Sequence, residues 1–151
     1  MRQAVRTATQ GIRNLEGGPF GAVIVRRNKM IAMAHNTVLK TQNASCHAEI
    51  NAIGIASRKL GKYDLSDCVI YSTTEPCPMC FSAIHWARIP RIVFGTAIQD
   101  VRKRGFHELS ISNTSMKRYG KSRVKIRSGF MKKECLRLLR MWDKKPNKQV
   151  Y

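Results

Sequence analysis

The 151-residue sequence predicts a three-layer α/β protein, with a sheet between helices. Two features of the pattern favour this class. Short apolar stretches typical of strands alternate with longer segments in which apolar residues recur every three or four positions. Two of the strand-like stretches also follow each other with only a tight turn between them. We therefore expect a sheet that begins with a hairpin and continues through helical crossovers.

The first part of the chain supplies a helix, the hairpin and a second helix. Residues 1–15 have helical periodicity, which ends at a Gly-Gly-Pro sequence. Two predicted strands at 20–27 and 30–38 form the hairpin. A polar loop leads to a predicted helix at 47–61. One face of this helix is expected to carry Ala48, Ala52, Ile55 and Ala56, with Ile53 at its edge.

The rest of the chain continues the alternation. Strands are predicted at 67–75, at 91–97 and near 124–129, and a helix with prolines in its first turn is predicted at 76–89. An amphipathic helix at 130–142 closes the domain. One side of this last helix is expected to consist of Met131, Cys135, Leu138, Leu139 and Trp142.

Composition limits the class of protein further. The chain is long enough to bury its own core, so we expect one domain over 1–151. The sequence contains no run of about eighteen apolar residues, which a membrane-spanning helix would need, and the N-terminus lacks a secretory signal pattern. Five cysteines, an odd number, favour unpaired thiols in a reducing compartment, and the expected location is the cytoplasm. Cys68 and Cys135 lie in apolar patterns and are expected to be buried.

Charge is unevenly distributed along the chain. The sequence has 28 Lys and Arg against 9 Asp and Glu, and residues 101–151 hold 16 of the basic and 3 of the acidic residues. Such a basic region predicts an anionic partner, with nucleic acid first among the candidates. A highly charged, solvated surface is an equally good interpretation, because the basic residues are dispersed among helical apolar positions.

Two short motifs carry the chemistry. In SCHAEINAIG, His47 and Glu49 stand at the start of a predicted helix. In EPCPMC, Cys77 and Cys80 are three positions apart and share one face of the next helix. No second CxxC pair exists, so we expect His47 to complete a zinc site. Three protein ligands leave one zinc position for water, which is typical of a catalytic zinc.

Glu49 follows the histidine by two residues, so its carboxylate is expected to reach the metal-bound water and to act as general acid and base. The spacing matches H-x-E…P-C-x-x-C, the signature of zinc-dependent nucleobase deaminases. Cys46, next to the predicted ligand, is expected to be a spectator.

From about Gly17 to Gly105 the sequence resembles the cytidine deaminase-like superfamily. GGPFGAVIV, AHNTV, HAEINAI, EPCPMC and AIHWAR look most like bacterial guanine deaminases, while HAE and EPCxMC are shared with tRNA-specific adenosine deaminases. The resemblance implies a five-stranded mixed sheet between helices, one Zn²⁺ in each subunit and a homodimer. It also implies that water attacks the amino-bearing ring carbon while Glu49 transfers the protons.

The guanine deaminase likeness further implies contacts to a planar base. The residues it assigns to these contacts are Asn36, Phe20, Ala48, Trp86, Glu108 and Tyr151. Asn36 would hydrogen-bond the ring, although an Asn at a strand end also caps turns. Glu108 would stand near the leaving amine, where an aspartate one methylene shorter is usual. Tyr151 would close the pocket, whereas composition alone favours a disordered basic tail.

Three functions follow from these patterns. The first is hydrolysis of guanine to xanthine and ammonia. The second is adenosine-to-inosine deamination in tRNA, because residues 112–139 look closer to the adenosine deaminase branch and the basic last third suits phosphate contacts. The third is a noncatalytic RNA-binding protein that keeps zinc for stability, and the intact Glu49 argues against it.

Overall fold

Five strands form one sheet in the computed structural model, which describes residues 1–146 and 148–151. The strands are β1 at Gly21–Arg26, β2 at Lys29–His35, β3 at Cys68–Thr74, β4 at Arg91–Thr96 and β5 at Lys125–Arg127. Their order across the sheet is β2-β1-β3-β4-β5. β1 pairs antiparallel with β2 and β3, whereas the β3–β4 and β4–β5 pairs are parallel. The mixed five-stranded sheet expected from the sequence is confirmed.

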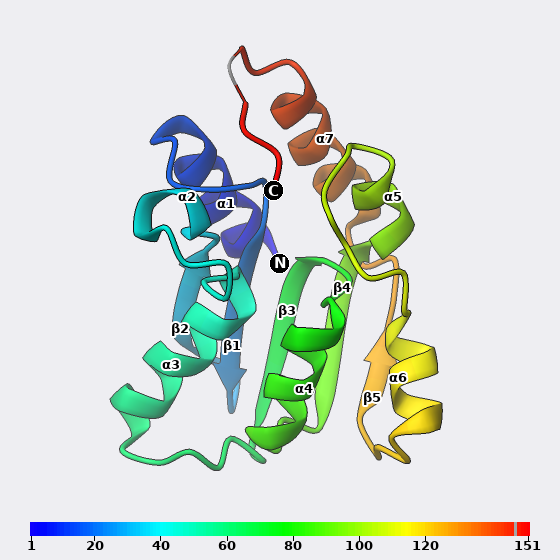
Figure 1. The fold of residues 1–151 in the computed structure, drawn as a ribbon. Coiled ribbons are helices and arrows are strands. Elements are labelled where there is room, and N and C mark those ends of the chain that lie inside the picture. The colour runs from blue at the N-terminus through cyan, green and yellow to red at the C-terminus, as the bar shows by residue number, and fades with distance from the viewer. Residues whose placement is uncertain (147) are drawn as a thin grey trace.

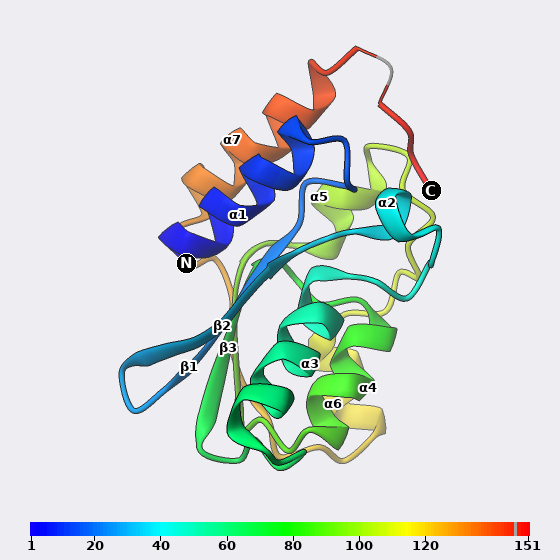
Figure 2. The same cartoon turned by 90° about the vertical axis from the view of Figure 1, so that its left-hand side faces the viewer.

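Helices cover both faces of this sheet (Figures 1 and 2). One face carries α1 at Arg2–Arg13 and α7 at Lys132–Asp143. The other carries α3 at Ala48–Leu60, α4 at Pro78–Trp86 and α6 at Asn113–Tyr119. Two short helices, α2 at Val38–Thr41 and α5 at Ile98–Arg102, lie beyond the upper end of the sheet in Figure 1. Within the described ranges, no helix is long and apolar enough to cross a membrane.

The core lies on the two sides of the sheet, where the apolar helix faces pack. On α3 the fully buried positions are Ala48, Ala52 and Ala56. Their small side chains let the helix lie close to β1 and β2. Ile55, expected on the same face, is only partly buried. On α7 the buried residues are Cys135, Leu138, Leu139 and Trp142, as the periodicity predicted. Cys68 is buried as well.

The elements that sequence analysis missed are the short ones. α2, α5 and α6 have four, five and seven residues, and segments this short show too few turns for an apolar period to be recognised. The strand expected to run to Val38 ends at His35, because Val38 begins α2. Met131, expected in the last helix, precedes it in the left-handed conformation with φ 55°.

Candidate active site

Three metal-ligating side chains meet where α3 and α4 begin. His47 and Cys77 are the residues immediately before the two helices, and Cys80 lies in the first turn of α4. The Nδ1 atom of His47 is 3.6 Å from the sulfur of Cys77 and 3.6 Å from the sulfur of Cys80. One ligand atom from each residue lies within 4.8 Å of the others. The structure therefore brings together the set that the two sequence motifs predicted.

The geometry of this set fits zinc. Tetrahedral zinc with bonds of about 2.0–2.1 Å to nitrogen and about 2.3 Å to sulfur requires a nitrogen–sulfur separation of about 3.6 Å. Hydrogen bonds from Cys80 and His47 lower the pKa of the Cys77 thiol to about 4, against the opposing effect of burial. Cys77 is therefore a thiolate at neutral pH, which is the form that binds metal.

Glu49 lies beside these ligands, in the first turn of α3, and is 5% exposed. The Ser72 hydroxyl at the end of β3 donates to its Oε1 over 2.8 Å, and its Oε2 is 3.5 Å from the sulfur of Cys80. Burial, followed by the negative charge of Cys77, raises the pKa of the Glu49 carboxyl. A carboxyl with a raised pKa next to a metal site has the properties of a general acid and base.

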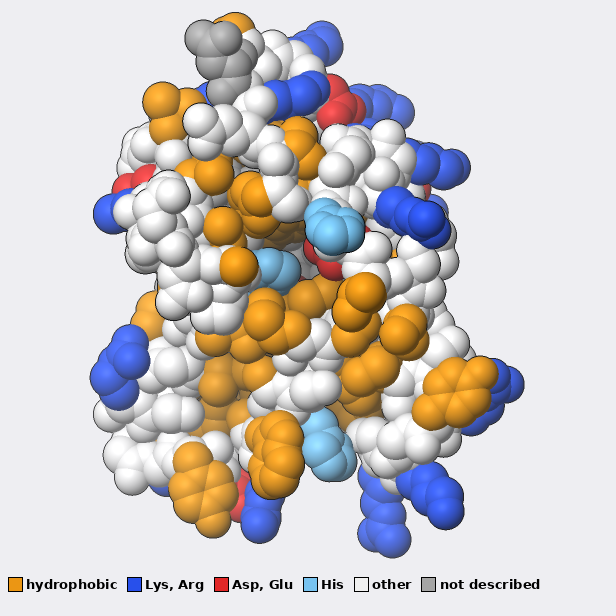
Figure 3. Space-filling model, viewed as in Figure 1, with side chains coloured by type: hydrophobic (Ala, Val, Ile, Leu, Met, Phe, Trp, Pro, Cys, Tyr) orange, Lys and Arg blue, Asp and Glu red, His pale blue; other side chains and the backbone are white. Residues whose placement is uncertain are grey.

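A cavity of about 320 Å³ opens at the metal ligands His47 and Cys77. Figure 3 shows it as a hollow lined largely by hydrophobic side chains. Phe20 and Tyr151 line it, and Glu108 supplies the carboxyl group in its wall. Burial, and then the charge of Cys77, raises the pKa of Glu108 to about 7. Glu108 can therefore give or take a proton near neutral pH.

Asn36 lies directly behind this wall and is fully buried. Its Oδ1 accepts hydrogen bonds from the backbone N–H of Val38 at 3.1 Å, the N–H of Gly18 at 3.4 Å and the Tyr151 hydroxyl at 2.5 Å. Its Nδ2 has no partner in the described part of the chain. Because three donors hold the oxygen, the orientation of the amide is determined and the unpaired group is an N–H donor.

The C-terminal tail folds back over the cavity instead of leaving the domain. From α7 it returns between α2 and α5 (Figures 1 and 2). The Tyr151 ring packs edge-on against Phe106, with centroids 5.6 Å apart, and its carbonyl accepts from the N–H of His107. Burial raises the pKa of its hydroxyl, which stays protonated and donates to Asn36. Composition alone had favoured a disordered tail, but aromatic packing and hydrogen bonds anchor its last residue.

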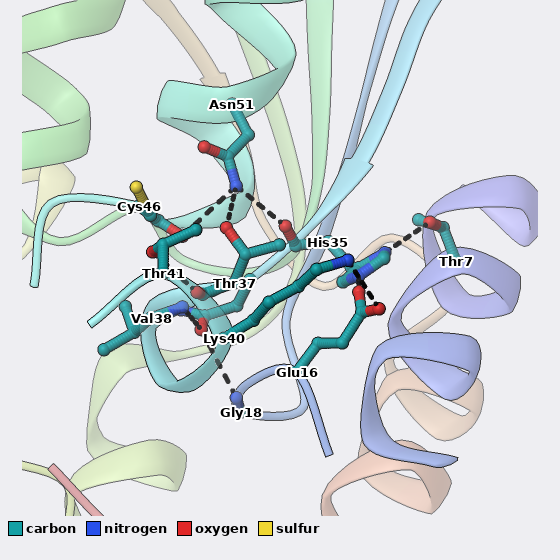
Figure 4. A network of polar contacts seen from close by, with 11 residues as sticks. Thr7, Glu16, Gly18, His35, Thr37, Val38, Lys40, Thr41, Cys46 and Asn51 are labelled. Carbon is teal, nitrogen blue, oxygen red and sulfur yellow. Dashed lines mark hydrogen bonds and ion pairs between the residues drawn. The ribbon is translucent and has the colours of Figure 1, made fainter. Parts of the chain in front are cut away.

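A second polar network fixes the strand end that carries Asn36 (Figure 4). The Nδ2 atom of Asn51, in α3, donates to the carbonyl of His35 and the hydroxyl of Thr37, both at 3.0 Å, and approaches the Cys46 carbonyl at 3.2 Å. His35 and Thr37 flank Asn36, while Cys46 precedes the ligand His47. Asn51 therefore joins the metal site to Asn36 through backbone groups.

One of the predicted contact residues lies away from the cavity of its own chain. Trp86 was expected to form an apolar wall, but it is 80% exposed and does not line the cavity of its own chain. It is the last residue of the nine-residue α4, whose start holds the zinc ligands, so it lies roughly 13 Å further along the helix axis. Ala48 is buried next to His47 behind the cavity surface. The Cys46 side chain belongs neither to the ligand group nor to the wall.

Residues that sequence reasoning did not select complete the wall. Phe106 and Leu109 line it on either side of His107 and Glu108. They come from the irregular stretch between α5 and α6, where no apolar period exists to indicate them. The available signal was the motif GFHEL itself, in which Phe106 and Leu109 lie within two residues of the selected Glu108.

A family model described as the cytidine and deoxycytidylate deaminase zinc-binding region matches residues 1–96. The match covers more than half of the chain and includes His47, Glu49, Cys77 and Cys80. The chain belongs to this family of zinc-dependent deaminases.

Individual relatives fall into two groups. The guanine deaminase of Bacillus subtilis is 41% identical over 108 residues, which are 72% of this chain and 69% of that protein. The tRNA-specific adenosine deaminase of Buchnera aphidicola is 35% identical over 121 residues, 80% of this chain and 77% of that protein. Among solved structures, the guanine deaminase from Nitrosomonas europaea has a TM-score of 0.82 at 28% identity, with 91% of this chain and 79% of that chain covered.

Proposed function

We propose that this protein hydrolyses guanine to xanthine and ammonia. The observation that carries the proposal is the cavity itself: it has a volume of about 320 Å³, it is mostly apolar, and Tyr151 of the same chain forms part of its wall. An unpaired amide donor on Asn36 lies just behind it. A free planar base fits such a space, whereas a nucleotide within a polymer requires an open path for the backbone on both sides.

His47, Cys77 and Cys80 are the residues that would hold zinc. The zinc would supply a polarised water that is nucleophilic at neutral pH. The protein's part is to keep Cys77 as a thiolate and to leave the cavity side of the site free for the base. The buried position of Cys80 excludes solvent from the opposite side.

Glu49 moves the protons. In the proposed reaction its carboxylate takes a proton from the attacking water, passes it to the ring nitrogen next to the amino-bearing carbon, and then helps to protonate the departing amine. The overall change adds one water and releases one ammonia. Ser72 holds one carboxylate oxygen, so the other remains available for proton transfer.

The base is held from several sides. Asn36 would donate from Nδ2 to an acceptor on the ring, since its oxygen is already occupied. Phe20 and Tyr151 would be walls around the plane, and Ala48, whose side chain is buried, would contribute through its backbone next to His47. Glu108 would face the leaving amine, and its extra methylene relative to aspartate is accommodated because it already lines the cavity.

Release of ammonia from guanine by the zinc-loaded protein tests this function, with Glu49→Ala as the blank. Release well above the blank is expected. A wild-type protein of verified zinc content that releases no more ammonia than the blank would exclude guanine as the substrate.

Deamination of adenosine in tRNA is a second candidate, favoured by the charge of residues 101–151. Among the described residues, Arg104 is the one basic side chain of this region in an ion pair with a carboxylate. The charges of the other described basic side chains of this region are not neutralised by a carboxylate, so they can attract phosphate groups. Inosine formation in tRNA, falling steeply as salt rises, would support this candidate over guanine.

We also propose that the protein consists of one deaminase domain, lies in the cytoplasm and forms a homodimer. All five cysteines are free, which suits a reducing compartment. Figure 3 shows hydrophobic side chains gathered on the face that carries α4 and α6. Met79 and Trp86 of α4 and Ile111, shortly before α6, are exposed. A second copy of the chain would cover them. Light scattering should give twice the mass of the chain, and Trp86→Ser should weaken the association.

A further inference from the structure

Glu75 is a buried carboxylate that the proposed reaction does not use. It follows the end of β3, stands two residues before the ligand Cys77 and is 7% exposed. Its backbone N–H donates to the carbonyl of Thr96 over 2.8 Å. Its side chain accepts two hydrogen bonds, from the N–H of Ile98 at 3.1 Å and from the N–H of Asn113 at 2.8 Å.

Both donors are the first residues of helices. Ile98 begins α5 and Asn113 begins α6, where backbone N–H groups lack partners within the helix. One carboxylate therefore satisfies two helix starts, one with each oxygen. The Asn113 side chain, which is fully buried, returns a hydrogen bond of 2.5 Å to the carbonyl of Pro76, the residue directly before Cys77.

The segment between these two anchors carries one wall of the cavity. Phe106, Glu108 and Leu109 all lie within residues 98–113. Most of that stretch has no regular hydrogen-bonded structure of its own. The middle of the stretch is held by Phe106, which packs against Trp142 and Tyr151, and by the bond from the His107 N–H to Tyr151, whereas both of its ends are held by Glu75.

We propose that Glu75 is a positioning residue for base binding, which clamps the two ends of the 98–113 wall to the strand end that carries Cys77. This role rests on the proposed deaminase function, because it is the base that the wall contacts. The clamp keeps Phe106 and Glu108 at a constant distance from the metal ligands. The remaining metal and proton-transfer groups, His47 and Glu49, come from α3 and are independent of it.

Glu75→Gln tests the clamp with little change in volume. An amide has one oxygen and one NH₂ group, so one of the two backbone donors would face another donor and lose its acceptor. We expect zinc content to stay at the wild-type level, KM for guanine to rise about tenfold or more and kcat to change by less than about threefold. Hydrogen exchange at the amides of Ile98 and Asn113 should accelerate.

Ser112→Ala is the matched control. Ser112 precedes the same helix, and its hydroxyl accepts from the N–H of Ser115 at 3.1 Å. The substitution loosens the start of α6 but leaves both bonds of Glu75 intact, so KM should stay near the wild-type value. Should Glu75→Gln fail to fold, Glu75→Asp replaces it, because the shorter carboxylate keeps the charge but cannot reach both donors.

The possible results distinguish failure of the clamp proposal from failure of the proposed deaminase function. Unchanged exchange of the 98–113 amides together with an unchanged KM would overturn the clamp, as would a Ser112→Ala variant with the same rise in KM. If the wild-type protein releases no ammonia from guanine, the proposed function fails, and the exchange measurement still decides whether Glu75 holds the wall. Faster exchange confined to 98–113, combined with a raised KM, supports the proposal.

Discussion

Removal of a single oxygen at the C-terminus should weaken base binding. The Tyr151 hydroxyl donates to Asn36 and accepts from the N–H of Gly18 at 3.1 Å. Tyr151→Phe deletes both hydrogen bonds and leaves the ring on Phe106. Each bond contributes about 0.5–1.5 kcal/mol net. Because the Gly18 N–H also contacts Asn36 Oδ1, part of its bonding remains, and the total loss should be about 1–2 kcal/mol.

Because these bonds orient Asn36 and do not contact the base, the loss is the upper limit of the effect on binding, and it corresponds to a KM for guanine up to about 5–30 times higher. The effect should not depend on pH in the neutral range, since burial keeps the hydroxyl protonated in the wild-type protein. The assay is ammonia release over a range of guanine concentrations, with zinc content measured on the same samples. kcat should change little, because neither the metal ligands nor Glu49 contacts the hydroxyl.

Tyr119→Phe is the comparison variant for this measurement. Tyr119 is 73% exposed on α6, and its hydroxyl bonds only to the neighbouring Arg118 within the described residues. Its loss should leave KM unchanged. If Tyr151→Phe gave a KM within about twofold of the wild-type value, the assignment of Tyr151 as the residue that orients Asn36 would be refuted.

Three further predictions concern the other parts of the site. Cys80→Ser should lower the zinc content and the Tm, both measurable without an activity assay, because one of three ligands is lost. Ser72→Ala removes a hydrogen bond that lowers the pKa of Glu49, so the pKa should rise and the acid limb of the kcat/KM profile should move to higher pH; an unmoved limb would contradict this. Asn51→Asp replaces the amide donor, which joins the metal site to the strand end at Asn36, by an acceptor, so KM for guanine should rise. Asn51→Gln keeps a donor and should retain more affinity, as titration with guanine would reveal.

The metal site could be predicted from the sequence because its residues lie within two short motifs. The ligand spacing within each motif follows from helix geometry, and both motifs stand at helix starts that periodicity and proline placement indicate. Pairing His47 with Cys77 and Cys80 needed one assumption, that the two strands before these helices run in the same direction, so that both helices begin at the same end of the sheet; β2 and β3 do so on either side of β1. The structure bears this out, with both Nδ1–sulfur distances at 3.6 Å.

The cavity wall could not be predicted in the same way. Phe106 and Leu109 lie in an irregular stretch whose course depends on hydrogen bonds to Glu75, a contact between residues more than twenty positions apart. Such contacts leave no periodic trace in a sequence. The position of Trp86 depends on the length of α4, which carries this residue away from the cavity of its own chain.

The crowding around Asn36 limits how this site can change during evolution. A methyl group added at Gly17 would come within 2.2 Å of Asn36 Oδ1, so every larger residue there displaces the amide that orients the base. Any substitution at Asn36 that removes its side-chain oxygen would in turn leave the donors of Gly18, Val38 and Tyr151 without their common acceptor. A lineage that acquires a new substrate must therefore alter the glycine loop, the strand end and the tail together, and gradual single steps should pass through poorly active intermediates.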